Sequence, residues 1–355
     1  KDIRDKRANL NAQEIGDPNK RAAQWKKEQE MHDRDGNPIR REPVFDEAVL
    51  ADMVKTGVQR LTGMQLSDGG WGWFSGYGEY ASAHTTALVV HGLLLAREND
   101  VALVPGMVER GIEWLKRYQA EQVALLKNAA KDPKPEGWRW KSSADNLDAF
   151  VYMVLGESKI EDADMREFLH RDRNGLSVYA KGMFGLALHK QNQKEKRDMI
   201  LQNIEQFLVQ DEENQTAHLN LGNEGWWWCW YGSEIEAHAY YLKLLCAVDP
   251  KTEKASRLVK YLLNNRKHAT YWESTRDTAI CVEAFADFIK ATGEDKPDMT
   301  VEVLLDGKKQ KEVKIDGTNL FTCDNTFVLG GDAVEDGKHT VELRKKGTGA
   351  LYFNA

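Results

Sequence analysis

One local pattern recurs along most of the chain: a turn that carries tryptophan, followed by an apolar run with helical spacing. Three copies are "GGWGWFSGYGEYASAHTTALVVHGLLLA", "EGWWWCWYGSEIEAHAYYLKLLCAVDP" and "ATYWESTRDTAICVEAFADFIKATG", and a looser fourth copy is "EGWRWKSSADNLDAFVYMVLGE". A more charged helical run follows each copy and leads to the next turn. Repeats of this kind predict similar helical units packed side by side.

Hydrophobic periodicity gives the expected helices their positions. Apolar residues recur at i, i+3, i+4 and i+7 in a series of runs. The predicted helices span residues 46–64, 80–98, 106–129, 144–157, 161–170, 175–191, 193–210, 233–248, 251–266 and 273–291. Asp46, Ser233 and Ser274 are candidate N-cap residues. Apolar helices that alternate with amphipathic ones predict an α/α toroid like that of the terpenoid cyclases and prenyltransferases.

The period changes at Lys296-Pro297, which predicts a change of structure. Residues 298–355 alternate apolar and polar side chains, and Asp-Gly turns at 306–307, 316–317 and 336–337 divide them. We therefore expect a mainly α chain in three parts. Residues 1–45 form a polar segment with a short helix near residues 18–31, residues 46–293 form the toroid, and residues 298–355 form four or five antiparallel strands. This β segment is too short for an independent sandwich.

Composition excludes several classes of protein and leaves the compartment open. The net charge of −7 comes from interspersed acidic and basic residues, which argues against nucleic-acid binding, and no apolar run is long enough to span a membrane. The chain begins at Lys1 without a signal peptide, so we expect a fragment of a longer protein. Its separated cysteines, with no C-x-x-C pair, argue against a zinc or redox site. These are Cys229, Cys246, Cys281 and Cys323.

The first tryptophan turn fits a known structural motif. "QLSDGGW" matches Q-x-x-x-G-x-W, the turn of triterpene cyclases in which Gln caps a helix and Trp stacks on it. The chain has neither the D-x-D-D acid of those cyclases nor the D-x-C of zinc prenyltransferases. We therefore predict that the tryptophan turns are architectural. The residues expected to build them are Gln65, Gly69, Trp71, Trp73, Trp226, Trp228 and Trp272.

A carbohydrate-active toroid is the enzymatic alternative, because such enzymes use paired carboxylates in an aromatic groove. Aromatic candidates are Trp138, Trp140, Trp226, Trp227, Trp228, Trp230 and Trp272. Carboxylates at the starts of the apolar helices are Asp145, Asp148, Glu234, Glu236, Glu273 and Asp277. Acidic residues also occur at helix N-termini for electrostatic reasons alone, so the pattern does not decide the matter.

Histidine spacing offers no clear metal site. His84 and His91 are seven residues apart, and Glu234 and His238 are four apart, but neither pair has a third ligand nearby and H-E-x-x-H is absent. G-x-S-x-G, Walker A and Rossmann fingerprints are absent as well. We therefore expect no catalytic residue, metal or cofactor in this chain.

The order of these elements resembles the bacterial alpha-macroglobulins, relatives of α2-macroglobulin and the complement thioester proteins. The resemblance rests on "MQLSDGGWGWF", "TTALVVHGLLLA", "WYGSEIEAHAYYLKLLCAVDP" and "YWESTRDTAICVEAFADFI", followed by "LFTCDNTFVLGG" and "KKGTGALYFNA", and it covers residues 45–355. It implies that the toroid is a thioester domain inserted into a CUB β-sandwich. Residues 298–355 would then be the second half of that CUB domain.

The resemblance also implies a function outside the cytoplasm, namely broad-spectrum inhibition of endopeptidases by trapping. Target proteases and neighbouring macroglobulin domains are the implied partners. The C-x-E-Q string of the family's thioester is absent, and "CVEA" at 281–284 lacks its Gln. The region of the family's transfer histidine, near residues 141–150, contains no His, which implies direct attack on a thioester with amines preferred. A structural envelope domain without a thioester remains a third alternative.

Overall fold

The computed structural model describes residues 47–74, 78–131, 137, 139–222, 233–266, 271–294, 296–319, 337–349 and 351. The predicted helix at 18–31, the candidate cap Asp46, and Trp226 and Trp228 lie outside these residues. Within them the chain is mainly α-helical, as predicted. The helices are α3 (Glu47–Met64), α4 (Ala83–Glu98), α5 (Met107–Ala129), α6 (Asn146–Glu157), α7 (Ala163–Arg171), α8 (Val178–Lys190), α9 (Lys194–Glu205), α10 (Glu234–Val248), α11 (Glu253–Asn264) and α12 (Thr275–Thr292).

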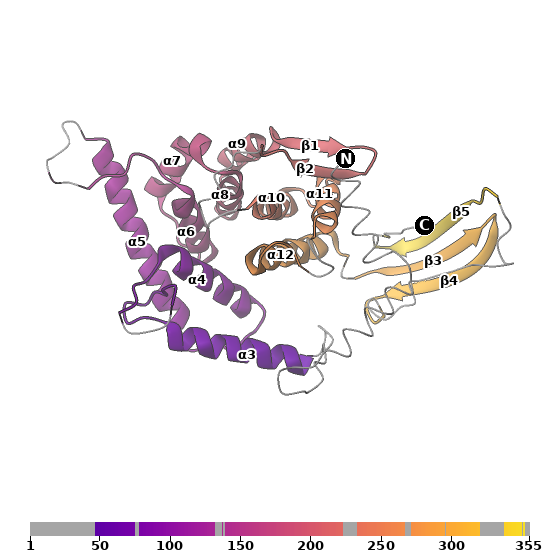
Figure 1. Cartoon of the computed structure of the whole chain (residues 1–355), viewed down its shortest axis with the longest axis horizontal. Coiled ribbons are helices and arrows are strands. Elements are labelled where there is room, and N and C mark those ends of the chain that lie inside the picture. Colours follow the sequence, from indigo (N-terminus) through magenta and orange to yellow (C-terminus); the bar gives the residue numbers. More distant parts are fainter. Residues whose placement is uncertain are drawn as a thin grey trace.

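The helices form two concentric layers, which confirms the α/α toroid. The inner helices α4, α6, α8, α10 and α12 are grouped in the middle, and α5, α7, α9 and α11 surround them (Figure 1). In the inner layer, α4 packs on α6, α6 on α8, α8 on α10 and α10 on α12. Each inner helix therefore has neighbours on more than one side, as its apolar composition requires.

Burial along single helices shows the difference between the layers. In α10 every residue from Glu236 to Cys246 is buried. In the outer helix α11 the buried residues are Ala255, Arg257, Leu258 and Leu262, which recur at helical spacing. The apolar run of α10 and the amphipathic run of α11 thus correspond directly to their places in the toroid.

Side-chain caps start most of the inner helices. Ser82, Asp145, Ser233 and Ser274 each accept a hydrogen bond from a backbone N–H of the first turn. The predictions for Ser233 and Ser274 are therefore correct. Caps of this type satisfy N–H groups that have no partner inside the helix, and they fix where each tryptophan turn ends and the next inner helix begins.

A β-hairpin replaces the end of one predicted helix. The helix expected over 193–210 ends at Glu205, and strands β1 (Leu208–Asp211) and β2 (Thr216–Leu219) follow. They pair antiparallel, with Leu208 opposite Leu219. The prediction was wrong here because β2 packs against α11, and this tertiary contact outweighs weak helical periodicity in the sequence.

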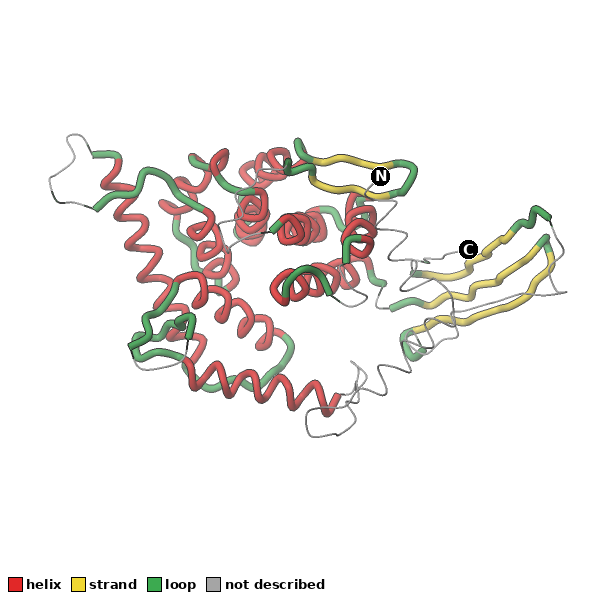
Figure 2. The backbone as a smooth tube through the Cα atoms, in the orientation of Figure 1, coloured by secondary structure: helices red, strands yellow, loops and turns green. Residues whose placement is uncertain are grey.

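A separate antiparallel sheet follows α12. Its order is β4-β3-β5, with β3 (Asp298–Leu305) between β4 (Lys308–Asp316) and β5 (Val341–Thr348) (Figure 2). Leu305 pairs with Lys308, and Asp306 and Gly307 both have positive φ values of 48° and 78°. The predicted Asp-Gly hairpin is therefore present, because a two-residue turn of this type needs positive φ at both positions.

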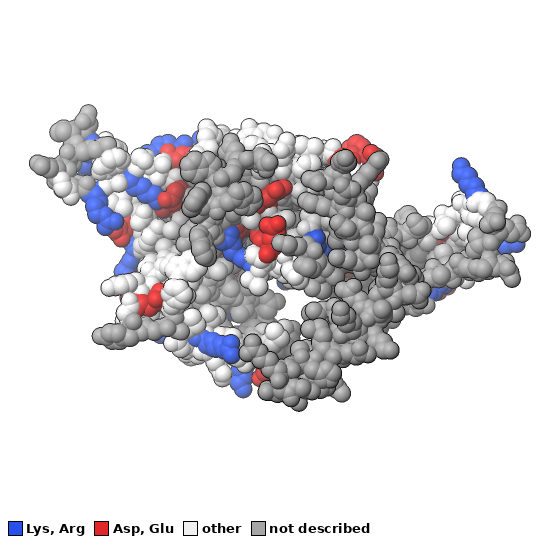
Figure 3. Space-filling model, in the orientation of Figure 1, with Lys and Arg blue, Asp and Glu red and all other residues white. Residues whose placement is uncertain are grey.

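The surface of the described residues carries interspersed charge. Lys and Arg alternate with Asp and Glu over the coloured part of the face shown in Figure 3. In the described part of the chain, no helix combines the length and apolar character needed to cross a membrane.

Candidate functional site

The first tryptophan turn connects α3, α4 and α5. Trp71 is 1% exposed, and its indole N–H donates a 2.8 Å hydrogen bond to the Leu61 carbonyl in the last turn of α3. Its backbone N–H donates to the Thr86 hydroxyl of α4. Trp71 thus contacts α3 and the following inner helix α4 at once.

Trp272 repeats this arrangement between α11 and α12. It is 3% exposed, its indole N–H donates to the Leu262 carbonyl at 2.9 Å, and its backbone N–H donates to the Thr278 hydroxyl at 3.1 Å. In both turns the indole bonds to the carbonyl ten residues earlier. These two copies of the sequence repeat therefore share their hydrogen bonding as well.

Gln65 and Gly69 hold the first turn in shape. The Gln65 side-chain amide donates to the carbonyls of Gly69 and Met107, each at 2.9 Å. Gly69 has φ of 96°, and a Cβ atom built on it would lie 2.7 Å from the Arg110 carbonyl oxygen. A close approach to α5 and a left-handed backbone therefore both require glycine here.

Among the described residues, other aromatic side chains of the turns are exposed. Trp73 is 49% exposed and stacks on His84 with ring centroids 6.0 Å apart. Other exposed aromatic residues in the segments that precede inner helices are Phe74, Tyr80, Trp140 and Tyr271. We call these five residues the aromatic rim.

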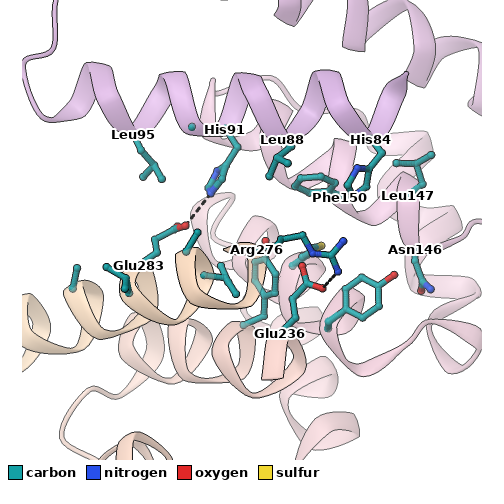
Figure 4. Close-up of a pocket in the computed structure, with 18 of the residues that line it drawn as sticks. His84, Leu88, His91, Leu95, Asn146, Leu147, Phe150, Glu236, Arg276 and Glu283 are labelled. Carbon is teal, nitrogen blue, oxygen red and sulfur yellow. Dashed lines mark hydrogen bonds and ion pairs between the residues drawn. The ribbon is translucent and has the colours of Figure 1, made fainter. Parts of the chain in front are cut away.

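A cavity of about 770 Å³ lies among the inner helices. All five inner helices α4, α6, α8, α10 and α12 contribute to its wall, and the side chains of α4 and α12 face each other across it (Figure 4). Most of the wall is apolar, as at Leu88, Leu147 and Phe150. Charged groups also line it, among them His91, Glu283, Glu236 and Arg276.

His91 of α4 is the centre of one charged cluster in the cavity wall. Its ring nitrogens lie 2.8 Å from a Glu157 oxygen of α6 and 3.2 Å from a Glu283 oxygen of α12. Burial alone lowers the pKa of His91, but hydrogen bonds and the charges of the two carboxylates outweigh it and raise the pKa to about 10. Lys243 of α10 also pairs with Glu283. This cluster joins four inner helices.

Glu236 and Arg276 form a second ion pair in the cavity wall. An Arg276 nitrogen lies 2.7 Å from a Glu236 oxygen and joins α12 to α10. Burial and the nearby Asp277 raise the pKa of Glu236, while Arg276 opposes that rise. Burial and the charge of Arg276 lower the pKa of His84 to about 4.

The candidate carboxylates of a carbohydrate-active site do not form one cluster. Asp148 is buried against Lys141 at 2.7 Å, Asp277 accepts hydrogen bonds from Ser233 and Ser274, and Glu234 accepts one from a Tyr261 hydroxyl. Glu273 is exposed beside Trp272. Asp145 and Glu236 are the two that line the cavity. Trp138, Trp227 and Trp230 lie outside the described residues, as do Trp226 and Trp228.

Neither histidine pair forms a metal site. The Nδ1 of His238 contacts the backbone carbonyl of Glu234 instead of its carboxylate. Among the described residues, no group of three or more His, Cys, Asp or Glu side chains is placed to hold a metal ion. Cys246 and Cys281 are buried free thiols, while Cys229 and Cys323 lie outside the described residues.

Comparison with known families identifies the family of the chain. A model described as the A-macroglobulin TED domain matches residues 39–288. The chain belongs to the alpha-macroglobulin family. The alpha-2-macroglobulin of Thermotoga maritima is 24% identical over 67% of the chain, and the alpha-2-macroglobulin homolog of Nostoc sp. is 22% identical over 87%. The chain covers 12% and 15% of those two proteins.

Solved alpha-2-macroglobulins share the fold of this family member. A Salmonella alpha-2-macroglobulin reacted with methylamine superposes with a TM-score of 0.53 at 18% identity, over 79% of this chain and 17% of that one. A native Escherichia coli alpha-2-macroglobulin, from its MG7 domain to the C-terminus, superposes with a TM-score of 0.50 at 19% identity. The match covers 90% of this chain and 47% of that one. At these identities the likeness establishes the fold.

Sequence reasoning about this alpha-macroglobulin missed the charged cluster around His91. His91 was considered only with His84, seven residues away, whereas its partners Glu157 and Glu283 are distant in sequence. A signal was present, because His91, Lys243 and Glu283 each interrupt an apolar inner-helix run. Charged groups in such runs are stable only when paired.

Proposed function

We propose that this chain is part of an alpha-macroglobulin that inhibits endopeptidases outside the cytoplasm by trapping them. The single observation that supports this most is the match of the TED-domain model to residues 39–288. The chain spans less than a sixth of the length of the two curated relatives. Trapping is therefore a property proposed for the longer protein, in which this chain supplies a scaffold.

The chain does not contain the reactive group of such an inhibitor. No C-x-E-Q string occurs in the 355 residues, and Cys281 is fully buried inside α12. In the proposed function a thioester therefore comes from sequence outside this chain. Its carbonyl carbon would accept a nucleophile such as an amine, and its sulfur would leave as thiolate.

The aromatic rim is the proposed contact surface for neighbouring domains of the same protein. Phe74 and Tyr80 are 75% and 86% exposed, and they lie in the segment between α3 and α4. Exposed aromatic residues are enriched at protein interfaces. Contact with a neighbouring macroglobulin domain would cover them.

The decisive experiment uses the longer protein. Its intact mass and its titre of free thiols are measured before and after incubation with methylamine. The proposal predicts the addition of one methylamine per molecule and one new thiol, because aminolysis of a thioester releases one thiolate. After pre-treatment, an endopeptidase should no longer become covalently attached.

Two other results would contradict the proposal. Unchanged mass and thiol titre, with no retention of an active endopeptidase during gel filtration, would indicate a structural envelope domain. Depletion or cleavage of a polysaccharide by the 355-residue chain would instead support the carbohydrate-active alternative. The variant Glu236→Gln is the control for that second outcome, because Glu236 lines the cavity.

A further inference from the structure

A buried histidine joins the β1–β2 hairpin to the inner helix α10. His238 of α10 is fully buried. Its Nε2 accepts a 2.8 Å hydrogen bond from the backbone N–H of Leu219 in β2. Its Nδ1 lies 2.6 Å from the backbone carbonyl oxygen of Glu234, one turn earlier in α10. Both ring nitrogens therefore have backbone partners.

The two backbone partners fix the protonation of this ring. The N–H of Leu219 can only donate, so Nε2 of His238 carries a lone pair and no proton. The carbonyl of Glu234 can only accept, so Nδ1 carries the proton. His238 is therefore held as the neutral Nδ1–H tautomer, with its one donor and its one acceptor both in use.

A stack of aromatic rings joins this histidine to further elements. Tyr261 of α11 stacks on His238 with ring centroids 4.7 Å apart, and His218 of β2 stacks on Tyr261 at 5.1 Å. The Tyr261 hydroxyl donates to the carboxylate of Glu234. The strand β2 and the helices α10 and α11 thus meet at this stack, and α11 packs against both β2 and α10.

The charges near His238 do not favour a second proton on its ring. Burial lowers its pKa to about 4, the hydrogen bond to the Glu234 carbonyl opposes this change, and the charge of His218 adds to it. Among the described residues, no carboxylate raises the pKa of His238. Charged side chains on the neighbouring helices α8, α11 and α12 have partners of their own: Lys181 with the Leu176 carbonyl, Arg257 with Glu212 and Glu253, Lys254 with Glu205, Arg276 with Glu236, and Asp277 with Ser233 and Ser274.

A proton on Nε2 would break the contact between His238 and β2. It would place a second N–H group against the N–H of Leu219, so that two donors would face each other. Nδ1 would remain bonded to the Glu234 carbonyl. An opposed pair of donors and an unpaired positive charge are both unfavourable in a buried site. Separation of β2 from α10 relieves both, because the ring then reaches water.

The β1–β2 hairpin is small enough to separate on its own. Its strands have four residues each, and a two-stranded hairpin has little stability by itself. Ala217 and Leu219 of β2 are buried, whereas Val209 of β1 is 40% exposed, so the hairpin is held mainly through β2. At its tip, Glu212 pairs with Arg257. This pair lowers the pKa of Glu212 from its usual 4.5, so the tip stays ionised above that pH.

We propose that His238 is an acid-sensitive latch, which holds the β1–β2 hairpin on α10 while it is neutral and releases the hairpin when it is protonated. In the released state the pKa of the ring returns to its usual 6.5, whereas in the closed state it is about 4. The released state therefore binds more protons between these values. The closed state loses stability as the pH falls from 6.5 towards 4.

The position of the hairpin in the chain gives the latch a wider effect. The segment that contains Trp226 and Trp228 connects β2 directly to α10. Release of β2 removes the anchor on one side of this tryptophan-bearing segment, while the Ser233 cap keeps the start of α10 in place on the other. Acid therefore acts first on the hairpin and this connection, before it acts on the inner helices.

The test measures amide hydrogen exchange in the longer protein at pH 7 and at pH 4.5. Each rate is divided by the intrinsic rate at the same pH, so that the protection factor reports local opening. Peptides that cover residues 207–221 report on the hairpin, and peptides from α6 report on the inner layer. His238→Gln supplies a neutral amide with a donor and an acceptor. His218→Gln is the matched control, because His218 stacks on the same tyrosine.

The proposal predicts that protection over 207–221 falls at least about tenfold between pH 7 and pH 4.5, while α6 stays protected. His238→Gln should abolish this fall, and His218→Gln should retain it. A second measurement uses the unaltered protein, in case the variant folds poorly. Exchange of the imidazole C2 proton, followed by mass spectrometry, should show His238 taking up a proton only below about pH 5.

Every other result overturns the latch. Full protection of the hairpin at pH 4.5 would mean that it stays closed, and equal loss in α6 would mean that acid unfolds the toroid as a whole. A fall that persists in His238→Gln, or disappears in His218→Gln, would assign the effect to another group. Titration of His238 near pH 6.5 would show that its ring is not held as the neutral tautomer. These outcomes do not involve methylamine or an endopeptidase, so they are independent of the proposed trapping.

Discussion

The indole N–H of Trp71 donates a 2.8 Å hydrogen bond to the carbonyl oxygen of Leu61. That carbonyl lies in the last turn of α3, where carbonyl groups have no partner within the helix. One side chain therefore satisfies a helix end and fills the space between the inner and outer layers. The indole N–H of Trp272 makes the same kind of hydrogen bond to the Leu262 carbonyl. In both turns the buried tryptophan therefore joins two helices.

Replacement of Trp71 by Phe should destabilise the chain by about 1–3 kcal/mol, because the ring shrinks and the Leu61 carbonyl loses its donor. Trp272→Phe should have a smaller effect, because the Leu262 carbonyl keeps the backbone N–H of Asn265 as a donor. The control is Phe74→Leu in the first turn, which is 75% exposed and should change stability by less than about 0.5 kcal/mol. Urea unfolding followed by circular dichroism measures all three. Equal stability of the three variants would refute an architectural role for the buried indoles.

Glycine 69 provides a second test of the same turn. Gly69→Ala combines an unfavourable positive φ with an approach of 2.7 Å to the Arg110 carbonyl oxygen, so we expect a loss of more than about 2 kcal/mol. Gly78→Ala is the matched control, because Gly78 also has positive φ but no atom near the added Cβ. It should cost about 1 kcal/mol. Thermal unfolding of both variants gives the difference between their losses of stability. That difference measures the cost of the close contact with α5.

Much of the fold is predictable from local sequence because the layers of a toroid differ in local pattern. The buried run of α10 and the amphipathic run of α11 are visible as such in the sequence, and Ser233 and Ser274 mark helix starts correctly. The hairpin at 208–219 is not predictable in this way, since its second strand depends on α11, a distant element.

The charged centre of the cavity was not predictable for the same reason. Glu157, His91 and Glu283 come from three different inner helices, and their meeting depends on the order in which those helices close the ring. Local spacing led instead to His84, which stacks on Trp73. The sequence signal available was the presence of ionisable groups within apolar runs, which shows that partners exist but not which ones.

Cys281 should behave as an inert thiol. It is fully buried, and burial together with the charge of Asp277 raises its pKa to about 12. We expect no detectable alkylation of Cys281 by iodoacetamide at pH 8 in the native chain, and complete alkylation after unfolding in urea, since thiolate is the reactive form. Peptide mass spectrometry identifies the modified position. Rapid native labelling at Cys281 would contradict the placement of this residue inside α12.

The ion pairs of His91 give the stability of the chain a defined pH dependence. The folded-state pKa of His91 is raised from 6.5 to about 10 by Glu157 and Glu283 against the opposing effect of burial. The folded state therefore binds one more proton than the unfolded state between these two values. The stabilisation is complete below pH 6.5 and decreases as the pH rises, by up to about 1.4 kcal/mol per pH unit, until it is lost near pH 10.

Glu283 sets the acid limit of the same cluster. Burial raises its pKa, but His91 and Lys243 outweigh burial and hold it near 2. Its contribution is therefore present above about pH 4.5 and decreases as the pH falls towards 2. Urea unfolding at a series of pH values should show these two slopes in the native chain. His91→Gln should flatten the alkaline slope, whereas His189→Gln should leave it in place, because the pKa of His189 is lowered by burial and by Arg197. An unchanged alkaline slope in His91→Gln would show that another group causes it.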